Sequence, residues 1–202
     1  MKKELIRSKL EAGMSPAEYL DYLKSKSGRI PDENWNQEEL HELNLFKLNY
    51  KRSLRIAKSY EPGIQITNLL KNNIVPQTWM IITEPWCGDS AQTLPSIFKF
   101  AHIGSLIEIK VILRDSNPDL MDLYLSPTGA RAIPKLVSFN SRVEELFQWG
   151  ARPAEAQQLV ERLKNEGMQK EQFLEQLHLW YSKDKGKALE NEFIKILEKF
   201  YK

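Results

Sequence analysis

The spacing of hydrophobic residues changes twice along this chain. Between residues 40 and 57, apolar side chains recur every three or four positions, which predicts a long amphipathic helix. The middle of the chain instead holds continuous apolar, β-rich runs at 78–86 and 106–115, and such runs are typical of buried strands. From Pro153 to the end, the helical spacing returns. The pattern therefore predicts helices, then a sheet, then helices.

Helix start signals indicate where the helices of the first third of the chain begin. Ser15 and Glu18 have the spacing of a capping box, with a proline at the first helical position, and Asn36 and Glu39 repeat that spacing before the long helix. Pro62 and the glycine after it end the helical pattern near Tyr60. We expect two helices here.

The middle third predicts a mixed sheet. The expected order is strand 78–86, helix 90–104, strand 106–115, a short helix after Asn117, strand 134–139 and strand 143–150. A β-α-β unit followed by a hairpin and a helix gives an α/β fold, with a central mixed sheet and helices on both faces.

Composition excludes several classes of protein. The 202 residues carry a formal charge of +2, and lysine and arginine are mixed with acidic residues, so we expect no nucleic-acid partner. We expect no membrane association, since no run approaches about 18 apolar residues. One cysteine excludes an intramolecular disulfide and favours the cytoplasm. His41, His102 and His178 have no ligand spacing between them, so we expect no metal site.

The single cysteine, Cys87, is the candidate chemical group. It falls where strand 78–86 ends and the next helix begins, and free backbone N–H groups and the helix dipole favour a thiolate there. Trp86 would supply a flat apolar wall, and Gly88 would let another chain approach. Glu84 and Asp89 oppose thiolate formation, because both are acidic.

Three features together resemble the thioredoxin family. They are Trp86-Cys87-Gly88-Asp89 at the strand–helix junction, Pro95 within the following helix, and Ile133-Pro134 before a hairpin. The closest pattern is a thioredoxin-like branch whose motif reads E-P-W-C-G-D-C. This resemblance implies a thioredoxin-like fold, a cis Pro134 beside the cysteine, and a substrate groove completed by Gly150 and Ala151.

The resemblance covers the middle of the chain only. It implies a thioredoxin-like core at 64–165, an N-terminal helical extension at 1–63 packed on that core, and a C-terminal helical extension at 166–202. Because the apolar faces of the N-terminal helices are too wide to leave in water, a separate N-terminal domain is disfavoured.

The chain departs from the family motif at its second cysteine, which is Ser90 here. A dithiol enzyme attacks a substrate disulfide with the first thiolate and releases the mixed disulfide with the second. A hydroxyl is too poor a nucleophile for that release. Ile81 also stands where the family carries a buried acid, which serves mainly the second thiol. Both changes favour a protein with one working thiol.

The leading hypothesis is a monothiol protein that exchanges disulfides through Cys87, with protein or small-molecule disulfides as partners. It would need no cofactor, but a small external thiol would release the product. The alternative is a redox-inactive thioredoxin-fold module that binds a partner chain beside Cys87 and Pro134, so enzymatic activity stays open. An iron–sulfur carrier ranks third. The expected catalytic residues are Cys87 and Ser90, and the expected substrate-binding residues are Trp86, Gly88, Asp89, Ile133, Pro134, Gly150 and Ala151.

Overall fold

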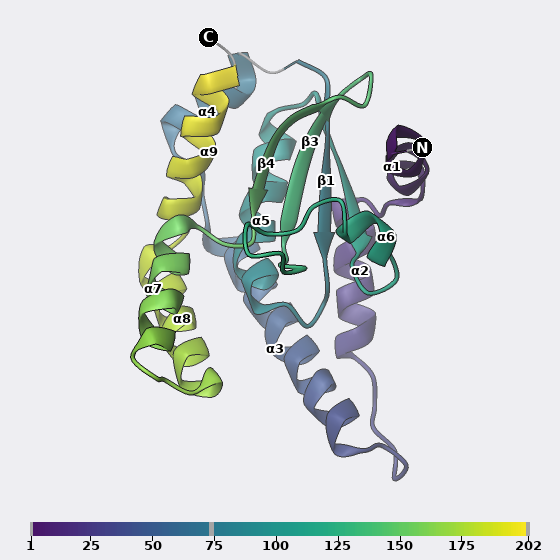
Figure 1. Cartoon of the computed structure of the whole chain (residues 1–202), viewed down its shortest axis with the longest axis vertical. Helices are drawn as coiled ribbons and strands as arrows, with labels where there is room; N and C mark the ends of the chain where they lie inside the picture. Colours follow the sequence, from purple (N-terminus) through teal and green to yellow (C-terminus); the bar gives the residue numbers. More distant parts are fainter. Residues whose placement is uncertain (1, 73–74, 201–202) are drawn as a thin grey trace.

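The computed structural model describes residues 2–72 and 75–200 (Figure 1). The elements in this part of the chain are, in order, α1 (Lys2–Ala12), α2 (Pro16–Ser27), α3 (Gln37–Ser59), α4 (Ile64–Asn72), β1 (Gln77–Thr83), α5 (Gly88–Ile103), β2 (Ile107–Leu113), α6 (Pro118–Met121), β3 (Lys135–Asn140), β4 (Glu145–Gly150), α7 (Ala154–Asn165), α8 (Lys170–Asp184) and α9 (Lys187–Phe200). Both capping boxes expected from the sequence are present, at Ser15 and Asn36.

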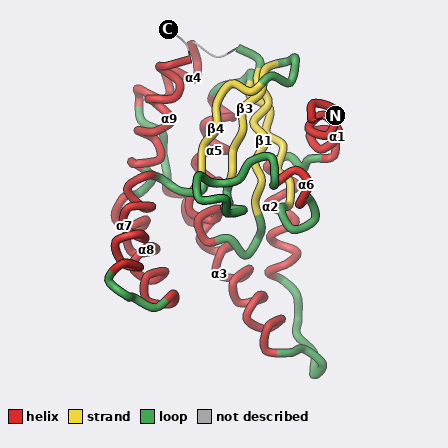
Figure 2. Tube along the Cα trace, viewed as in Figure 1, coloured by secondary structure: helices red, strands yellow, loops and turns green. Residues whose placement is uncertain are grey.

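The strands form one mixed sheet in the order β2-β1-β3-β4. β1 pairs parallel with β2 and antiparallel with β3, which pairs antiparallel with β4. The central strand β1 is buried on both faces, since Trp79 and Ile81 pack into one core cluster while Met80 and Ile82 pack into another. Helices cover both faces (Figure 2), so the predicted α/β fold is confirmed.

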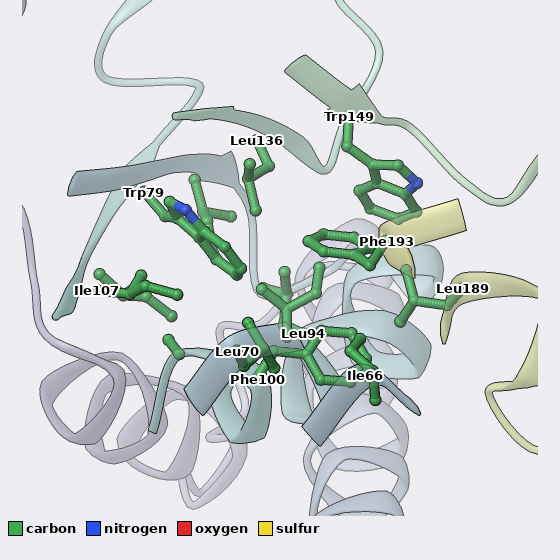
Figure 3. Close-up of a cluster of buried hydrophobic side chains, with 14 of the residues drawn as sticks. Ile66, Leu70, Trp79, Leu94, Phe100, Ile107, Leu136, Trp149, Leu189 and Phe193 are labelled. Carbon is green, nitrogen blue, oxygen red and sulfur yellow. The ribbon is translucent and has the colours of Figure 1, made fainter. Parts of the chain in front are cut away.

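The larger core cluster depends on the last helix, α9. Phe193 is fully buried, and its ring centroid lies 5.5 Å from Trp79, 5.2 Å from Phe100 and 5.7 Å from Trp149 (Figure 3). These distances are typical of favourable aromatic contacts. The C-terminal helix therefore completes the core over the sheet.

The smaller cluster covers the opposite face of the sheet. Ile6 and Leu10 of α1 pack there with Leu120 and Met121 of α6. The hydrophobic pattern does not predict α1, because two buried positions in 11 residues leave little periodicity to detect. Helix α4 is not predicted for the same reason, since only two of its residues are buried.

Strand β1 ends earlier than its apolar run suggests. The run continues to Trp86, but the strand stops at Thr83, because the Cys87 N–H donates a hydrogen bond to the Glu84 carbonyl (3.0 Å) and closes a turn. In residues 2–72 and 75–200, no helix is long and apolar enough to cross a membrane.

Helices α2 and α3 pack through buried apolar side chains, and the surface under them would face water in a chain that lacked these helices. Tyr19, Leu23, Leu43 and Phe46 are each at most 4% exposed. We therefore expect that deleting residues 1–60 leaves an insoluble or unfolded fragment, because the surface under these helices would face water. Expression of residues 61–202 and circular dichroism would check this. A soluble, folded fragment would contradict it and would make the N-terminal extension a dispensable addition.

The burial of Phe193 leads to a second prediction, which concerns the stability of the fold. Phe193→Ala should lower the free energy of unfolding by about 3–5 kcal/mol, because it opens a cavity in the aromatic cluster. Phe200→Ala is a matched control on the same helix, since Phe200 is 41% exposed. Chemical denaturation measures both. Equal losses for the two variants would show that α9 does not close the core as described.

Candidate functional site

Cys87 occupies the N-cap of α5, directly after the turn that ends β1. The residue is 7% exposed. Its Sγ lies 3.4 Å from the Ile133 carbonyl oxygen and donates a hydrogen bond to it. The peptide bond that contains this carbonyl, Ile133-Pro134, is cis, as predicted. Residues 46 positions apart in the sequence therefore meet at the end of the sheet.

The electrostatics around the thiol oppose ionisation. Burial raises the pKa of Cys87 to about 11, and the charge of Asp89 acts in the same direction. The Ser90 hydroxyl and the backbone N–H groups of Ser90 and Asp89 lower this pKa, as expected at a helix N-terminus, but they do not compensate. The expectation of a favoured thiolate is therefore wrong for this structure, because burial outweighs the helix N-terminus.

Ser90 stands where the family motif has its second cysteine, and it is a hydrogen-bonding group instead of a nucleophile. The side chain is 1% exposed, and its Oγ accepts a hydrogen bond from Thr83 Oγ1 at 2.6 Å. The Ser90 proton is then available to the sulfur of Cys87, in agreement with its effect on the pKa of that thiol. Among the described residues, no base contacts the Ser90 hydroxyl to activate it.

Asp89 forms a buried ion pair with the chain after the sheet. Its Oδ2 accepts hydrogen bonds from Arg152 Nη2 at 2.6 Å and Nε at 3.1 Å, and its Oδ1 accepts one from the Tyr181 hydroxyl at 2.7 Å. Burial raises the pKa of Asp89, while Arg152 and Tyr181 oppose that rise. This carboxylate therefore binds α8 and the loop before α7 to the N-terminus of α5.

Helix α8 also closes over Gly88. A Cβ atom on Gly88 would lie 2.8 Å from His178 Cε1, closer than real Cβ contacts allow. His178 Nδ1 lies 3.2 Å from Gln92 Nε2. Burial, with the charges of Arg52 and Arg152, lowers the pKa of His178 to about 4, so the ring is neutral near pH 7. Gly88 was expected to admit another chain, but α8 occupies that side.

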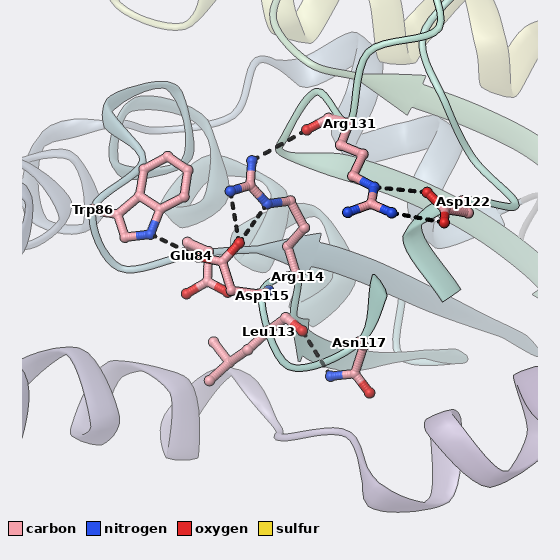
Figure 4. A network of polar contacts seen from close by, with 8 residues as sticks. All are labelled: Glu84, Trp86, Leu113, Arg114, Asp115, Asn117, Asp122 and Arg131. Carbon is pink, nitrogen blue, oxygen red and sulfur yellow. Dashed lines mark hydrogen bonds and ion pairs between the residues drawn. The ribbon is translucent and has the colours of Figure 1, made fainter. Parts of the chain in front are cut away.

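A polar network holds the other side of the site (Figure 4). The Trp86 indole N–H donates to Asp115 Oδ2 at 3.2 Å, and the guanidinium of Arg114 lies 4.7 Å from the centroid of the Trp86 ring. Arg114 also donates to the Arg131 carbonyl at 3.3 Å, in the loop before Pro134. The Arg131 guanidinium pairs with Asp122.

The loop at Pro134 and the end of β4 form one wall of a groove. The backbone at Gly150 has φ 126°, and a Cβ there would lie 2.1 Å from the Pro134 carbonyl oxygen, so this close approach requires glycine. A cavity of about 610 Å³ is lined by Ala132, Gly150, Ala151 and Arg152, with other residues of β4 and α7. The structure thus brings the predicted Ile133, Pro134, Gly150 and Ala151 together.

Sequence reasoning missed the contributions of the C-terminal half. Arg152, His178 and Tyr181 reach the motif from 63 to 92 residues away in the sequence. The one available signal was the acidic Asp89 within the motif, because a carboxylate there needs a cationic partner if it is buried. Within 2–72 and 75–200, no group of histidine, cysteine and acidic residues could hold a metal ion.

Comparisons with known proteins agree on the fold. A family model described as thioredoxin matches residues 36–164. An HIV epitope-scaffold protein has a similar structure, with a TM-score of 0.62 and 15% identity over 95% of this chain and 96% of that one. A Pseudomonas aeruginosa protein of unknown function has a TM-score of 0.56 and 14% identity, over 92% and 98% of the two chains. No curated protein matches.

The buried imidazole predicts a pH dependence. An unfolded histidine takes up a proton near pH 6.5, whereas folded His178 does so near pH 4, so the unfolded state binds more protons between these values. The contribution of His178 to stability is therefore complete above pH 6.5 and is lost as the pH falls toward 4.

Urea denaturation across this range should show a shallower loss of stability for His178→Gln than for the wild type. The difference in slope should be at most about 1.4 kcal/mol per pH unit, the value for one proton. His41→Gln, at an exposed position, is the control and should follow the wild type. Identical slopes for all three proteins would show that His178 is not buried as a neutral ring.

Proposed function

This chain belongs to the thioredoxin family, and we propose that it exchanges disulfides as a monothiol protein through Cys87. The substrates would be protein or small-molecule disulfides, and an external small thiol would complete the cycle. Such a cycle suits the reducing cytoplasm. No resident cofactor takes part.

The position of the sulfur carries this proposal. Cys87 Sγ lies against the carbonyl of the cis Ile133-Pro134 bond, and the groove of about 610 Å³ begins at the neighbouring Ala132 and Gly150. Neither Cys87 nor Pro134 lines this groove, so a bound chain would have to extend past Ala132 toward Ile133 to bring its own disulfide to the thiol. Ser90 provides a hydrogen bond for the sulfur and no second thiol.

The reaction balances without a change in the oxidation state of the protein. The Cys87 thiolate attacks one sulfur of a disulfide, the S–S bond breaks, and the other sulfur leaves as a thiolate. An external thiolate then attacks the sulfur of the bound partner. This step forms a new disulfide with the partner and returns Cys87 as a thiolate, which takes up a proton.

Burial of the thiol favours a second candidate function. Because the pKa of Cys87 is about 11 rather than 9.0, the thiolate fraction near neutral pH is about 100-fold lower than for an ordinary thiol. A thiol this weakly ionised suits a module that binds a partner chain in the groove without redox chemistry. The two functions differ in whether a mixed disulfide forms.

The alkylation rate of Cys87 against pH tests the state of the thiol. With iodoacetamide and mass spectrometry, the rate should increase about tenfold per pH unit and should not level off until about pH 11. The urea-unfolded chain is the control, since Cys87 is its only cysteine, and its rate should level off near the ordinary thiol pKa. A plateau below pH 8 in the folded protein would contradict the pKa argued from burial.

Incubation with oxidised glutathione separates the two functions. Monothiol exchange predicts that one glutathione per chain becomes attached to the wild type, persists, and leaves when reduced glutathione is added. Cys87→Ser should gain no glutathione. Ser90→Cys should lose the attached glutathione without added thiol, because the new cysteine can attack the mixed disulfide. Absence of a mixed disulfide even at alkaline pH would exclude the exchange and leave the binding module.

A further inference from the structure

A second cavity, of about 250 Å³, lies between α3, α5 and the corner that joins α8 to α9. Gln92 and Ser96 of α5 line its floor, while the exposed Arg55 and Lys185 stand at its mouth. It shares no lining residue with the groove beside Pro134. This cavity has no part in the exchange proposed for Cys87.

The Ser96 hydroxyl is the first observation that points to a ligand. Ser96 is 1% exposed, and its Oγ has no hydrogen-bond partner among residues 2–72 and 75–200. A buried hydroxyl without a partner destabilises the folded protein, so native structures contain few of them. Because Ser96 lines the cavity, a bound molecule would supply the missing partner.

The charges at the mouth are the second observation. Among the described residues, neither Arg55 nor Lys185 forms an ion pair. Arg55 also lies close enough to Arg52 to lower the pKa of that guanidinium, although burial is the larger cause. Two cations with no ion-pair partner beside a buried hydroxyl can form a site for an anion.

The nearby carboxylates already have partners. Asp184 accepts hydrogen bonds from the N–H groups of Gly186 and Ala188. Glu190 accepts one from the Tyr60 hydroxyl at 2.5 Å and others from the Gly63 N–H at 3.2 Å. The donors are neutral, so these acids still place negative charge beside Tyr60 of the cavity wall, but in the described part of the chain neither forms an ion pair with Arg55 or Lys185.

We propose that this cavity binds a small organic oxyanion, with its phosphate or carboxylate group between Arg55 and Lys185 and a hydroxyl group bonded to Ser96. A volume of about 250 Å³ corresponds to about eight water molecules, which suits a small metabolite rather than a chain segment. Ile56 and Tyr60 provide an apolar wall for its carbon skeleton. The site does not depend on the thiol.

Amide chemical-shift titration of the full chain tests the proposal. Glycerol phosphate carries a phosphate group and malate carries carboxylate groups, and both also carry a hydroxyl group. Glycerol is the uncharged control. At constant ionic strength, at least one of the two anions should shift the amides of Ser96, Ser182 and Gly186 in a saturable way, and glycerol should not. Saturation with one anion alone identifies the group that is recognised. No saturable shift with either anion would overturn the proposal.

Matched variants separate a built site from general charge attraction. Arg55→Gln with Lys185→Gln should weaken binding of that anion at least about tenfold. Lys58→Gln with Lys183→Gln removes two exposed cations of α3 and α8 that do not line the cavity. This control pair should change the affinity for the anion less than about twofold. Equal weakening by both pairs would overturn the proposal.

Ser96→Ala distinguishes a serine that binds the anion from a serine that only supports the fold. The variant should bind the anion more weakly, while the melting temperature of the unliganded protein should stay the same or rise, because an unpartnered hydroxyl is removed. A lower melting temperature with unchanged affinity would assign this hydroxyl to the fold and overturn its role in binding.

Discussion

A carboxylate removed from water needs a cationic partner, and Asp89 finds one in Arg152, with a further hydrogen bond from Tyr181. This contact joins the first turn of α5 to the loop before α7 and to α8. Breaking such a pair by removing one partner typically costs 3–5 kcal/mol. The position of α8 over the motif depends on it.

The same contact explains the opposing influences on Cys87. The N-terminus of α5 offers backbone N–H groups to the sulfur, as in any protein of this fold, but the neighbouring Asp89 carries negative charge into a buried space. Arg152 and Tyr181 stabilise that charge and, at the same time, keep it in place. After burial, which is the largest cause, the charge of Asp89 therefore opposes the ionisation that the helix N-terminus favours.

The sequence was sufficient to predict features that depend on local residues, and insufficient to predict contacts between distant segments. The strand ending before Cys87, the proline at 134 and the glycine at 150 were predictable, because each has a fixed place in a thioredoxin-like pattern. The docking of α8 was not, since His178 and Tyr181 read as ordinary positions of an amphipathic helix. Ser96 gave no signal at all. Its missing partner appears only when α3 and α8 are placed beside α5.

The close approach of His178 to Gly88 has a consequence for related sequences. A Cβ atom at position 88 would meet the imidazole carbon at 2.8 Å, so a larger residue there would force the His178 ring to shift. The two positions should therefore evolve as a coupled pair. In relatives whose α8 is shifted or absent, position 88 should be free to vary, and in relatives that keep α8, a larger residue at 88 should accompany a smaller one at 178.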